Sequence, residues 1–229
     1  MRAAVIVFPG SNCDRDIAAS LRDCDNMQVE MIWHGEHSLP KVDLVTVPGG
    51  FSYGDYLRAG AMAAHSPIMD AVVAAASAGI AVLGICNGFQ VLTERGLLPG
   101  VLMRNSNLKF ICHATTLKVA TNNSPFTSEF PFNGIVTMPI AHNEGNYFAD
   151  RHTLAELEAE DRIAFRYCTK QGEVTPESSP NGSIKSIAGV LSKSRRVLGM
   201  MPHPERAVDP AHNCTDGRYL FKSLVRHLS

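Results

Sequence analysis

Short apolar segments that end in glycine- or proline-containing turns are the feature of this sequence that most limits its possible folds. The apolar runs lie at residues 3–8, 27–33, 43–47 and 80–85, and helical patterns follow at about residues 14–23, 66–77 and 88–95. A short, nearly continuous apolar run is typical of a strand that is covered on both faces of a parallel sheet. The alternation of strand and helix predicts an α/β fold with right-handed crossover connections.

The second half of the chain has a different pattern. Strand-like segments lie at residues 110–121, 134–142, 163–167, 183–191 and 196–201, and an amphipathic helix is expected at residues 216–228. Turns separate the first four of these segments, which predicts an antiparallel extension of the sheet. We therefore expect an α/β fold with an open, mostly parallel sheet flanked by helices and an antiparallel extension in the second half. No internal repeat or low-complexity linker divides the sequence, so residues 1–229 are expected to form a single domain.

Charge and hydropathy exclude several classes of protein. The 229 residues include 21 Lys and Arg and 22 Asp and Glu, so no basic excess is available for nucleic acid. The longest apolar stretch, residues 71–86, is shorter than the roughly 20 residues that a spanning helix needs. The first residues also lack the pattern of a signal peptide. We therefore expect a cytoplasmic protein that binds neither a membrane nor nucleic acid.

The 6 cysteines are scattered through the sequence without a C-x-x-C pair. A chain of this length needs no disulfide bonds to hold its core, and a zinc site needs clustered ligands at short spacing. The adjacent Cys112 and His113 have no second cluster to join. We therefore expect neither disulfide bonds nor a metal site.

The segment Gly84-Ile85-Cys86-Asn87-Gly88 lies between a predicted buried strand and a predicted helix. It has the form of the G-x-S-x-G nucleophile elbow, with cysteine in place of serine. Side chains at positions 84 and 88 would collide across such a sharp turn. At a helix N-terminus the dipole favours a Cys86 thiolate, and the backbone N–H of Asn87 can stabilise an oxyanion. The alternative is a buried structural cysteine, which is a common environment for this residue.

A second motif, His203-Pro204-Glu205, directly follows the last predicted strand. A cysteine nucleophile needs a base, and the base needs a third group that fixes its tautomer. His203 and Glu205 are two residues apart and flanked by prolines, so both can be held rigidly. A histidine on a loop is otherwise more often an exposed polar residue, and only its combination with the elbow favours catalysis.

The two motifs together resemble the triad-type (class I) glutamine amidotransferases. Longer strings resemble, within that family, the glutaminase subunits of phosphoribosylformylglycinamidine synthases. These strings are Phe8–Asp14, Pro48–Asp55, Leu57–Ala61, Arg104–Ser106 and Met200–Arg206. They run from residue 8 to residue 206 and so span nearly the whole chain. In the family, a cysteine attacks the side-chain amide of glutamine, which releases ammonia and leaves a γ-glutamyl thioester.

The resemblance assigns roles residue by residue. It implies that Cys86 is the nucleophile, His203 the base and acid, and Glu205 the orienting partner of the histidine. Gly50 resembles a second oxyanion donor beside Asn87, and its missing side chain would let the backbone approach the substrate closely.

Two further positions match the glutamine-binding part of the family motif. Gln90, one helical turn after the nucleophile, corresponds to a position that contacts glutamine, and a solvent-facing helix glutamine is the alternative. His142 begins a loop that resembles the one holding the amino-acid end of glutamine. This sequence has Asn143 where the family has glycine, and asparagine tolerates a left-handed backbone better than most residues.

Two other residues have plainer interpretations. Cys13 has no H-P-E-like motif of its own and is interpreted as structural. Ser11 is interpreted as a helix N-cap rather than a catalytic residue.

Neither a P-loop nor a G-x-G-x-x-G motif is present in the sequence, so no cofactor is expected in this chain. Conversion of an amide to an amidine requires ATP. The resemblance therefore implies that this chain makes ammonia from L-glutamine and passes it to a synthetase subunit that carries ATP and Mg²⁺. That subunit would convert formylglycinamide ribonucleotide to formylglycinamidine ribonucleotide in de novo purine biosynthesis. A small third subunit is also implied.

Three other functions stay open on the sequence alone. A γ-glutamyl hydrolase or free-standing cysteine amidase would use the same framework and be fully active by itself. A regulatory or chaperone-like protein of the same fold would have no need of Cys86, His203 and Glu205 together. A redox-sensing cysteine protein would oxidise Cys86 and would not turn over glutamine.

Overall fold

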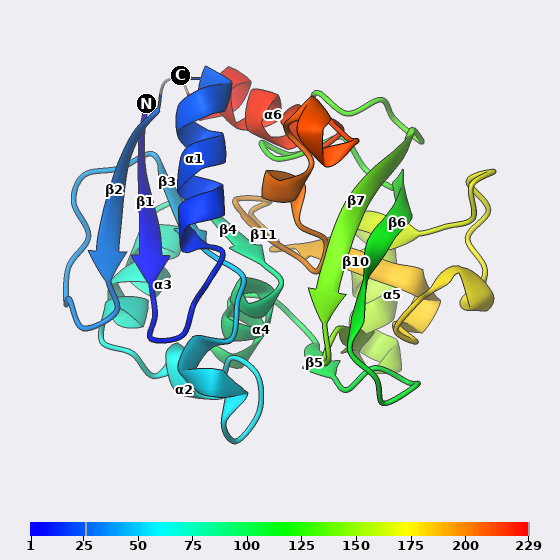
Figure 1. Ribbon diagram of the computed structural model, residues 1–229. Coiled ribbons are helices and arrows are strands. Elements are labelled where there is room, and N and C mark those ends of the chain that lie inside the picture. The colour runs from blue at the N-terminus through cyan, green and yellow to red at the C-terminus, as the bar shows by residue number, and fades with distance from the viewer. Residues whose placement is uncertain (26, 229) are drawn as a thin grey trace.

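A mixed sheet runs through the molecule in the computed structural model, which describes residues 1–25 and 27–228 (Figure 1). It has 9 strands. In spatial order these are β2 (Gln28–Trp33), β1 (Arg2–Val7), β3 (Leu44–Val47), β4 (Ala81–Ile85), β11 (Val197–Met200), β10 (Ile187–Leu191), β9 (Ile163–Tyr167), β6 (Ile111–Val119) and β7 (Ile135–His142). The strands from β2 to β11 in this order pair in parallel, and those from β11 to β7 pair antiparallel. The expected fold class is thus confirmed.

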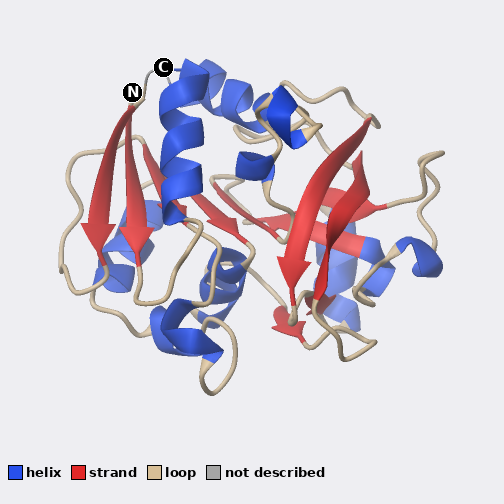
Figure 2. Cartoon of the chain, in the orientation of Figure 1, coloured by secondary structure: helices blue, strands red, loops and turns tan. Residues whose placement is uncertain are grey.

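Helices cover the parallel half of the sheet on both faces. The described residues form the helices α1 (Asp14–Asp25), α2 (Ala61–Ala64), α3 (Ile68–Ser77), α4 (Asn87–Glu94), α5 (Arg151–Ala159) and α6 (Arg218–Leu228), of which α5 lies at the antiparallel half of the sheet (Figure 1). In Figure 1, α1 lies in front of the parallel strands and α3 lies behind them, while Figure 2 shows the strands in red between the blue helices. Every residue of β3, β4 and β11 is consequently buried, which explains why these segments are apolar throughout.

The strand order places three chain segments at one edge of the sheet. Strands β3, β4 and β11 are neighbours and run in the same direction, so their carboxyl ends meet. Pro48-Gly49-Gly50 follows β3, Cys86 follows β4, and His203 follows β11. Ligands of open α/β sheets bind at this edge, because the loops beyond the carboxyl ends converge there.

The structure also contains elements that the sequence patterns did not predict. They are α2, α5 and a two-stranded sheet of β5 (Val101–Met103) and β8 (Asn146–Phe148). The missed α5 has an N-cap signal, because the Asp150 side chain accepts a hydrogen bond from the backbone N–H of Thr153. Residues 184–186 were expected to be strand but form a short 3₁₀ turn, in which Lys185 has a φ of 51°.

The remaining structural expectations concern membranes and disulfide bonds. Among the described residues, none of the helices is long and apolar enough to cross a bilayer. The cysteines with described side chains, Cys13, Cys86, Cys112, Cys168 and Cys214, are free thiols. The side chain of Cys24 lies outside the described part of the chain.

Candidate active site

Cys86 forms a sharp turn between β4 and α4. Its φ is 50° and its ψ is −107°, which is a strained backbone for a residue with a side chain. A Cβ atom at Gly84 would lie 2.8 Å from the carbonyl oxygen of Gly88, so the expected collision within the turn is present. A Cβ atom at Gly88 would lie only 1.8 Å from the carbonyl oxygen of Val47. The second glycine therefore allows the start of α4 to pack on the end of β3.

His203 and Glu205 form a buried hydrogen-bonded pair beside this turn. His203 Nδ1 is 2.6 Å from Glu205 Oε1, and the two residues are 1% and 2% exposed. The backbone N–H of His203 donates to the carbonyl oxygen of Pro139 at 2.9 Å. The hydroxyl of Ser20 donates to the backbone carbonyl of Glu205 at 3.0 Å. The pair is therefore held by β7 on one side and by α1 on the other.

Nearby negative charges raise the pKa of His203. Burial lowers the pKa of the imidazole, but the negative charges of Glu205 and of a Cys86 thiolate raise it, and the net result is well above the ordinary value. His203 Nε2 is buried and has no hydrogen-bond partner among the described residues. Nδ1 of the ring is thus hydrogen-bonded to Glu205, and Nε2 can exchange a proton with a reacting group.

Cys13, interpreted as structural from the sequence, lies beside His203. A Cβ atom at Gly49 would lie 2.8 Å from Cε1 of His203, 3.3 Å from Cβ of Cys86 and 3.4 Å from Sγ of Cys13. Gly49 thus permits both thiols to approach one imidazole. The first turn of the fold, where Cys13 lies, is brought here by the strand order and not by any local pattern.

Possible metal-ligand atoms of Cys13, His203 and Glu205 all lie within 4.8 Å of one another. The guanidinium of Arg206 donates to Cys13 Sγ at 3.3 Å, so a positive charge already contacts this sulfur. Glu205 is bonded to His203. Because these groups pair with one another, the arrangement favours an acid–base and nucleophile site over a cation site.

Gly50 is crowded by the chain itself. Its φ is 133°, and a Cβ atom would lie 2.7 Å from the backbone nitrogen of Asn12 and 3.0 Å from Cα of Ser11. Helix α1 begins at Asp14, so Ser11 lies too far before it to be the N-cap residue, and its expected helix-capping role is wrong. The Ser11 hydroxyl instead donates to the carbonyl oxygen of Gly49 at 3.1 Å. Close approach of the substrate is therefore not the sole reason for a glycine at position 50. The turn that contains Ser11 and Asn12 also leaves no room there for a side chain.

Asn87 and Gln90 are both buried on α4. Asn87 is the first residue of the helix, so its backbone N–H has no acceptor within α4. Gln90 is 5% exposed, and the solvent-facing alternative for it is wrong. The Gln90 amide accepts from Asn87 Nδ2 at 2.9 Å and donates to the carbonyl oxygen of Glu144 at 2.5 Å.

His142 is buried, and its ring nitrogens face protein groups. Nδ1 is 3.1 Å from Asn105 Oδ1, and Nε2 is 3.4 Å from Asn181 Nδ2. Burial, followed by the charge of His203, lowers the pKa of His142 to about 4, so its ring is neutral. The ring supports the loop that follows β7. Its predicted contact with glutamine stays a prediction. The end of β7 adjoins Cys86, because Cys86 Sγ lies 3.6 Å from the carbonyl oxygen of Ala141.

Comparison with known proteins agrees with this geometry. The sequence model of the CobB/CobQ-like glutamine amidotransferase domain matches residues 1–218. The chain belongs to this family of glutamine amidotransferases. It is 56% identical over 230 residues to the phosphoribosylformylglycinamidine synthase subunit PurQ of Rhodospirillum rubrum, with 100% of both chains covered. It is also 56% identical to the PurQ subunit of Ruegeria pomeroyi, covering 100% of this chain and 99% of the relative.

A solved structure shows the same fold. A chain of PurLQS from Thermotoga maritima superimposes with a TM-score of 0.88 and 41% identity, covering 100% of this chain and 99% of that chain. The resemblance to glutamine amidotransferases and the expected enzyme class are confirmed.

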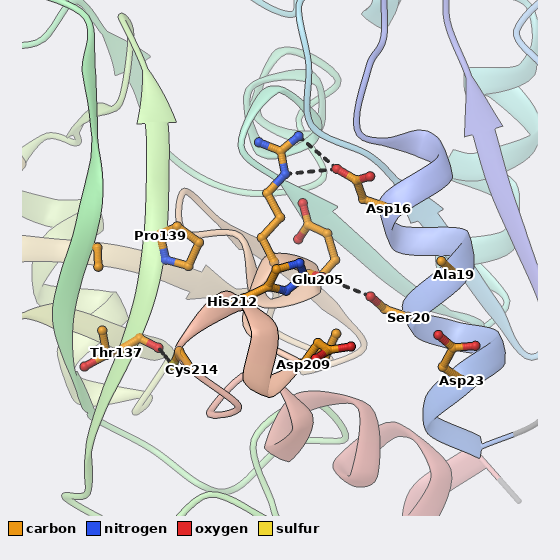
Figure 3. A pocket seen from close by; sticks show the side chains of 13 residues that line it. Asp16, Ala19, Ser20, Asp23, Thr137, Pro139, Glu205, Asp209, His212 and Cys214 are labelled. Atoms are coloured by element: carbon orange, nitrogen blue, oxygen red, sulfur yellow. Dashed lines mark hydrogen bonds and ion pairs between the residues drawn. The ribbon is translucent and has the colours of Figure 1, made fainter.

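In this amidotransferase a cavity of about 500 Å³ lies between α1, β7 and the turn that carries Glu205 (Figure 3). Asp16 and Ser20 on α1 face it, together with Thr137 and Pro139 of β7 and the segment around Glu205. Arg206 also lines it and pairs with Asp16 at 2.9 Å. Because Cys86 does not line this cavity, we do not assign the substrate to it.

The structure places near the start of α4 two carboxylates that the sequence patterns did not single out. Asp55 Oδ1 accepts a hydrogen bond from Asn87 Nδ2 at 3.2 Å, and Glu144 Oε2 accepts one from the backbone N–H of Ala59 at 3.2 Å. Asp55 lies in the string Pro48–Asp55, and Glu144 lies in the loop after His142. These two segments are far apart in the sequence, so the spacing within each one could not show that both contact α4.

Proposed function

We propose that this chain is the ammonia-producing subunit of a phosphoribosylformylglycinamidine synthase. The observation that carries the proposal is the buried His203–Glu205 pair beside the strained Cys86 elbow, in a chain 56% identical over its whole length to subunits of that name. A regulatory protein of the same fold would not need a nucleophile, a base and an orienting carboxylate in this arrangement.

The chemistry follows from the positions of these groups. The Cys86 thiolate attacks the side-chain amide carbon of glutamine, and the backbone N–H groups of Asn87 and Gly50 stabilise the oxyanion that forms. His203 gives its proton to the departing nitrogen, which leaves as ammonia, and a γ-glutamyl thioester stays on Cys86. His203 then takes a proton from water, whose oxygen attacks the thioester. The carbon–sulfur bond breaks, which forms glutamate, regenerates the Cys86 thiolate and leaves one proton on His203 and one in solvent.

The acceptor chemistry belongs to partner subunits in this proposal. ATP and Mg²⁺ on a synthetase subunit would activate the amide oxygen of formylglycinamide ribonucleotide, and ammonia would replace it. A small third subunit completes the proposed complex, which is supported by the likeness to a chain of PurLQS. Passage of ammonia within the complex would prevent its protonation and loss in bulk water.

Ammonia release from glutamine tests the proposal. The purified chain and Cys86→Ala are each assayed with and without the matching synthetase and small subunit. We expect weak release by the chain alone, a large increase with the partners, and none from Cys86→Ala. Full activity without partners would instead favour a free-standing hydrolase or amidase. If the partners elicit no Cys86-dependent ammonia, the amidotransferase reaction is not the function of this chain.

A further inference from the structure

The segment from Phe51 to Gly60 begins directly after Gly50 and is attached to α4 by the side chain of Asn87. Asn87 Oδ1 accepts a hydrogen bond from the backbone N–H of Ser52 at 3.1 Å. Asn87 Nδ2 donates to Asp55 Oδ1 at 3.2 Å and to Gln90 Oε1 at 2.9 Å. Asn87 is only 1% exposed, so water does not compete for these bonds. One amide therefore holds the segment at two positions.

The other end of the segment is attached to the same region. The backbone N–H of Ala59 donates to Glu144 Oε2 at 3.2 Å, and the carbonyl of Glu144 accepts from Gln90 Nε2. Gly60 has a φ of 81°, and a Cβ atom there would lie 2.8 Å from the backbone of Gln90 and Val91. The segment thus packs directly on the helix that begins at the nucleophile.

We propose that Asp55 is a positioning residue for glutamine hydrolysis, because it fixes the orientation of the Asn87 amide that aligns the two oxyanion donors. With Nδ2 on Asp55, the amide presents Oδ1 to the N–H of Ser52, whereas a flipped amide would set two donors against each other. Asn87 supplies one oxyanion donor from its own backbone. The Asn87 side chain holds the backbone of Ser52, two residues after Gly50. The backbone N–H of Gly50 supplies the other oxyanion donor. The inference rests on the proposed glutaminase function.

The surroundings of Asp55 disfavour its ionised form. Burial, followed by the charge of Glu144, raises the pKa of Asp55 to about 6, and the hydrogen bond from Asn87 only partly opposes the increase. Glu144 comes from the turn after β7, and its other charged neighbour is Arg104, at 3.8 Å. The side of α4 that faces Asp55 presents the neutral amide of Asn87.

The sign of the pH effect follows from this shift. The folded chain binds the Asp55 proton more tightly than the unfolded chain does, so its contribution to stability is complete below the ordinary pKa of 3.8 and is lost as the pH rises through about 6. At neutral pH the ionised carboxylate therefore weakens folding. The backbone adds strain, because Tyr53, Asp55 and Leu57 have φ values of 56°, 55° and 69°.

The test compares Asp55→Ala, which removes the acceptor for Asn87 Nδ2, with Asp55→Asn, which keeps an acceptor oxygen, and with the control Asp70→Ala. All are measured in complex with the synthetase and small subunit. Asp70 also carries an ion pair, with Arg95, but its side chain is 82% exposed on α3. Three quantities are measured: kcat and KM for ammonia release from pH 5 to 8.5, the Tm of each variant, and the rate at which iodoacetamide alkylates Cys86, followed on the Cys86 peptide. Alkylation reports on the thiolate and needs no oxyanion hole.

We expect Asp55→Ala to lower kcat at pH 7.5 by about 10-fold or more, with less than about a threefold change in KM, since loss of a whole oxyanion donor costs roughly 10²–10³-fold. Asp55→Asn still accepts the bond from Asn87, so it should retain most of kcat, with a Tm equal to or above that of the unsubstituted chain. Cys86 alkylation should be unchanged in both variants.

A double substitution gives a second readout. Asn87→Ala keeps the backbone N–H and removes the amide, so Asp55→Ala should cost nothing further in that background. An unchanged kcat in Asp55→Ala, or a loss of Tm and alkylation in parallel with kcat, would overturn the inference while the unsubstituted chain still releases ammonia. If the unsubstituted complex releases none, the proposed function itself fails.

Discussion

His203 keeps its proton in an environment that would by itself remove it. Burial lowers the pKa of the imidazole, and the nearby Glu205 carboxylate and Cys86 thiolate more than offset this effect. Glu205→Gln preserves the shape and one oxygen acceptor but removes the charge, so the pKa of His203 falls. We expect kcat to drop by about 10²–10⁴-fold and the alkaline limb of kcat/KM to move to lower pH. The measurement is a pH–rate profile beside that of Glu36→Gln, an exposed control on another loop. An alkaline limb that stays in place would show that Glu205 does not set the protonation of His203.

At the scale of elements, the turn that carries His203 and Glu205 depends on α1. The Ser20 hydroxyl, 3% exposed, donates to the Glu205 carbonyl, and Asp16 pairs with Arg206 one residue further on. Ser20→Ala leaves that carbonyl without its side-chain donor, so we expect the free energy of unfolding to fall by about 1–3 kcal/mol. Urea denaturation measures it, and Ser38→Ala, at an exposed position, should change it by less than about 0.5 kcal/mol. Equal effects of the two substitutions would mean that the hydroxyl does not stabilise the turn.

For the whole molecule, the active-site strands lie in the middle of the sheet and not at its edges. Strand β4 pairs with β3 and β11, while β2 and β7 each lack a neighbour on one side within the described sheet. Opening the centre requires most of the core to separate, whereas an edge strand can open locally. Native-state hydrogen exchange should therefore be slowest for the amides of β4 and β11 and clearly faster for β2. Comparable rates in β2 and β4 would contradict this order of stability.

Several features could be predicted from the sequence because each depends on residues that are close along the chain. The apolar runs predicted β1, β3, β4 and β11, since a strand covered on both faces is apolar at every position. The elbow glycines and the His203-Pro204-Glu205 motif are equally local. Weakly patterned elements such as α2 and β5 were missed, because four residues and three residues carry too little periodicity to be recognised.

What the sequence by itself determined is the fold class, the family and the residues proposed to react, because these depend on local periodicity and short motifs. The tertiary structure alone decided which distant groups surround them. Asp55 meets Asn87 across 32 residues, Glu144 meets Ala59 across 85, and Arg206 meets Asp16 across 190. The same is true of Cys13, whose position beside His203 was not expected. The strand order of the sheet brings these segments to one edge, and pairing between distant strands leaves no trace in the spacing of neighbouring residues.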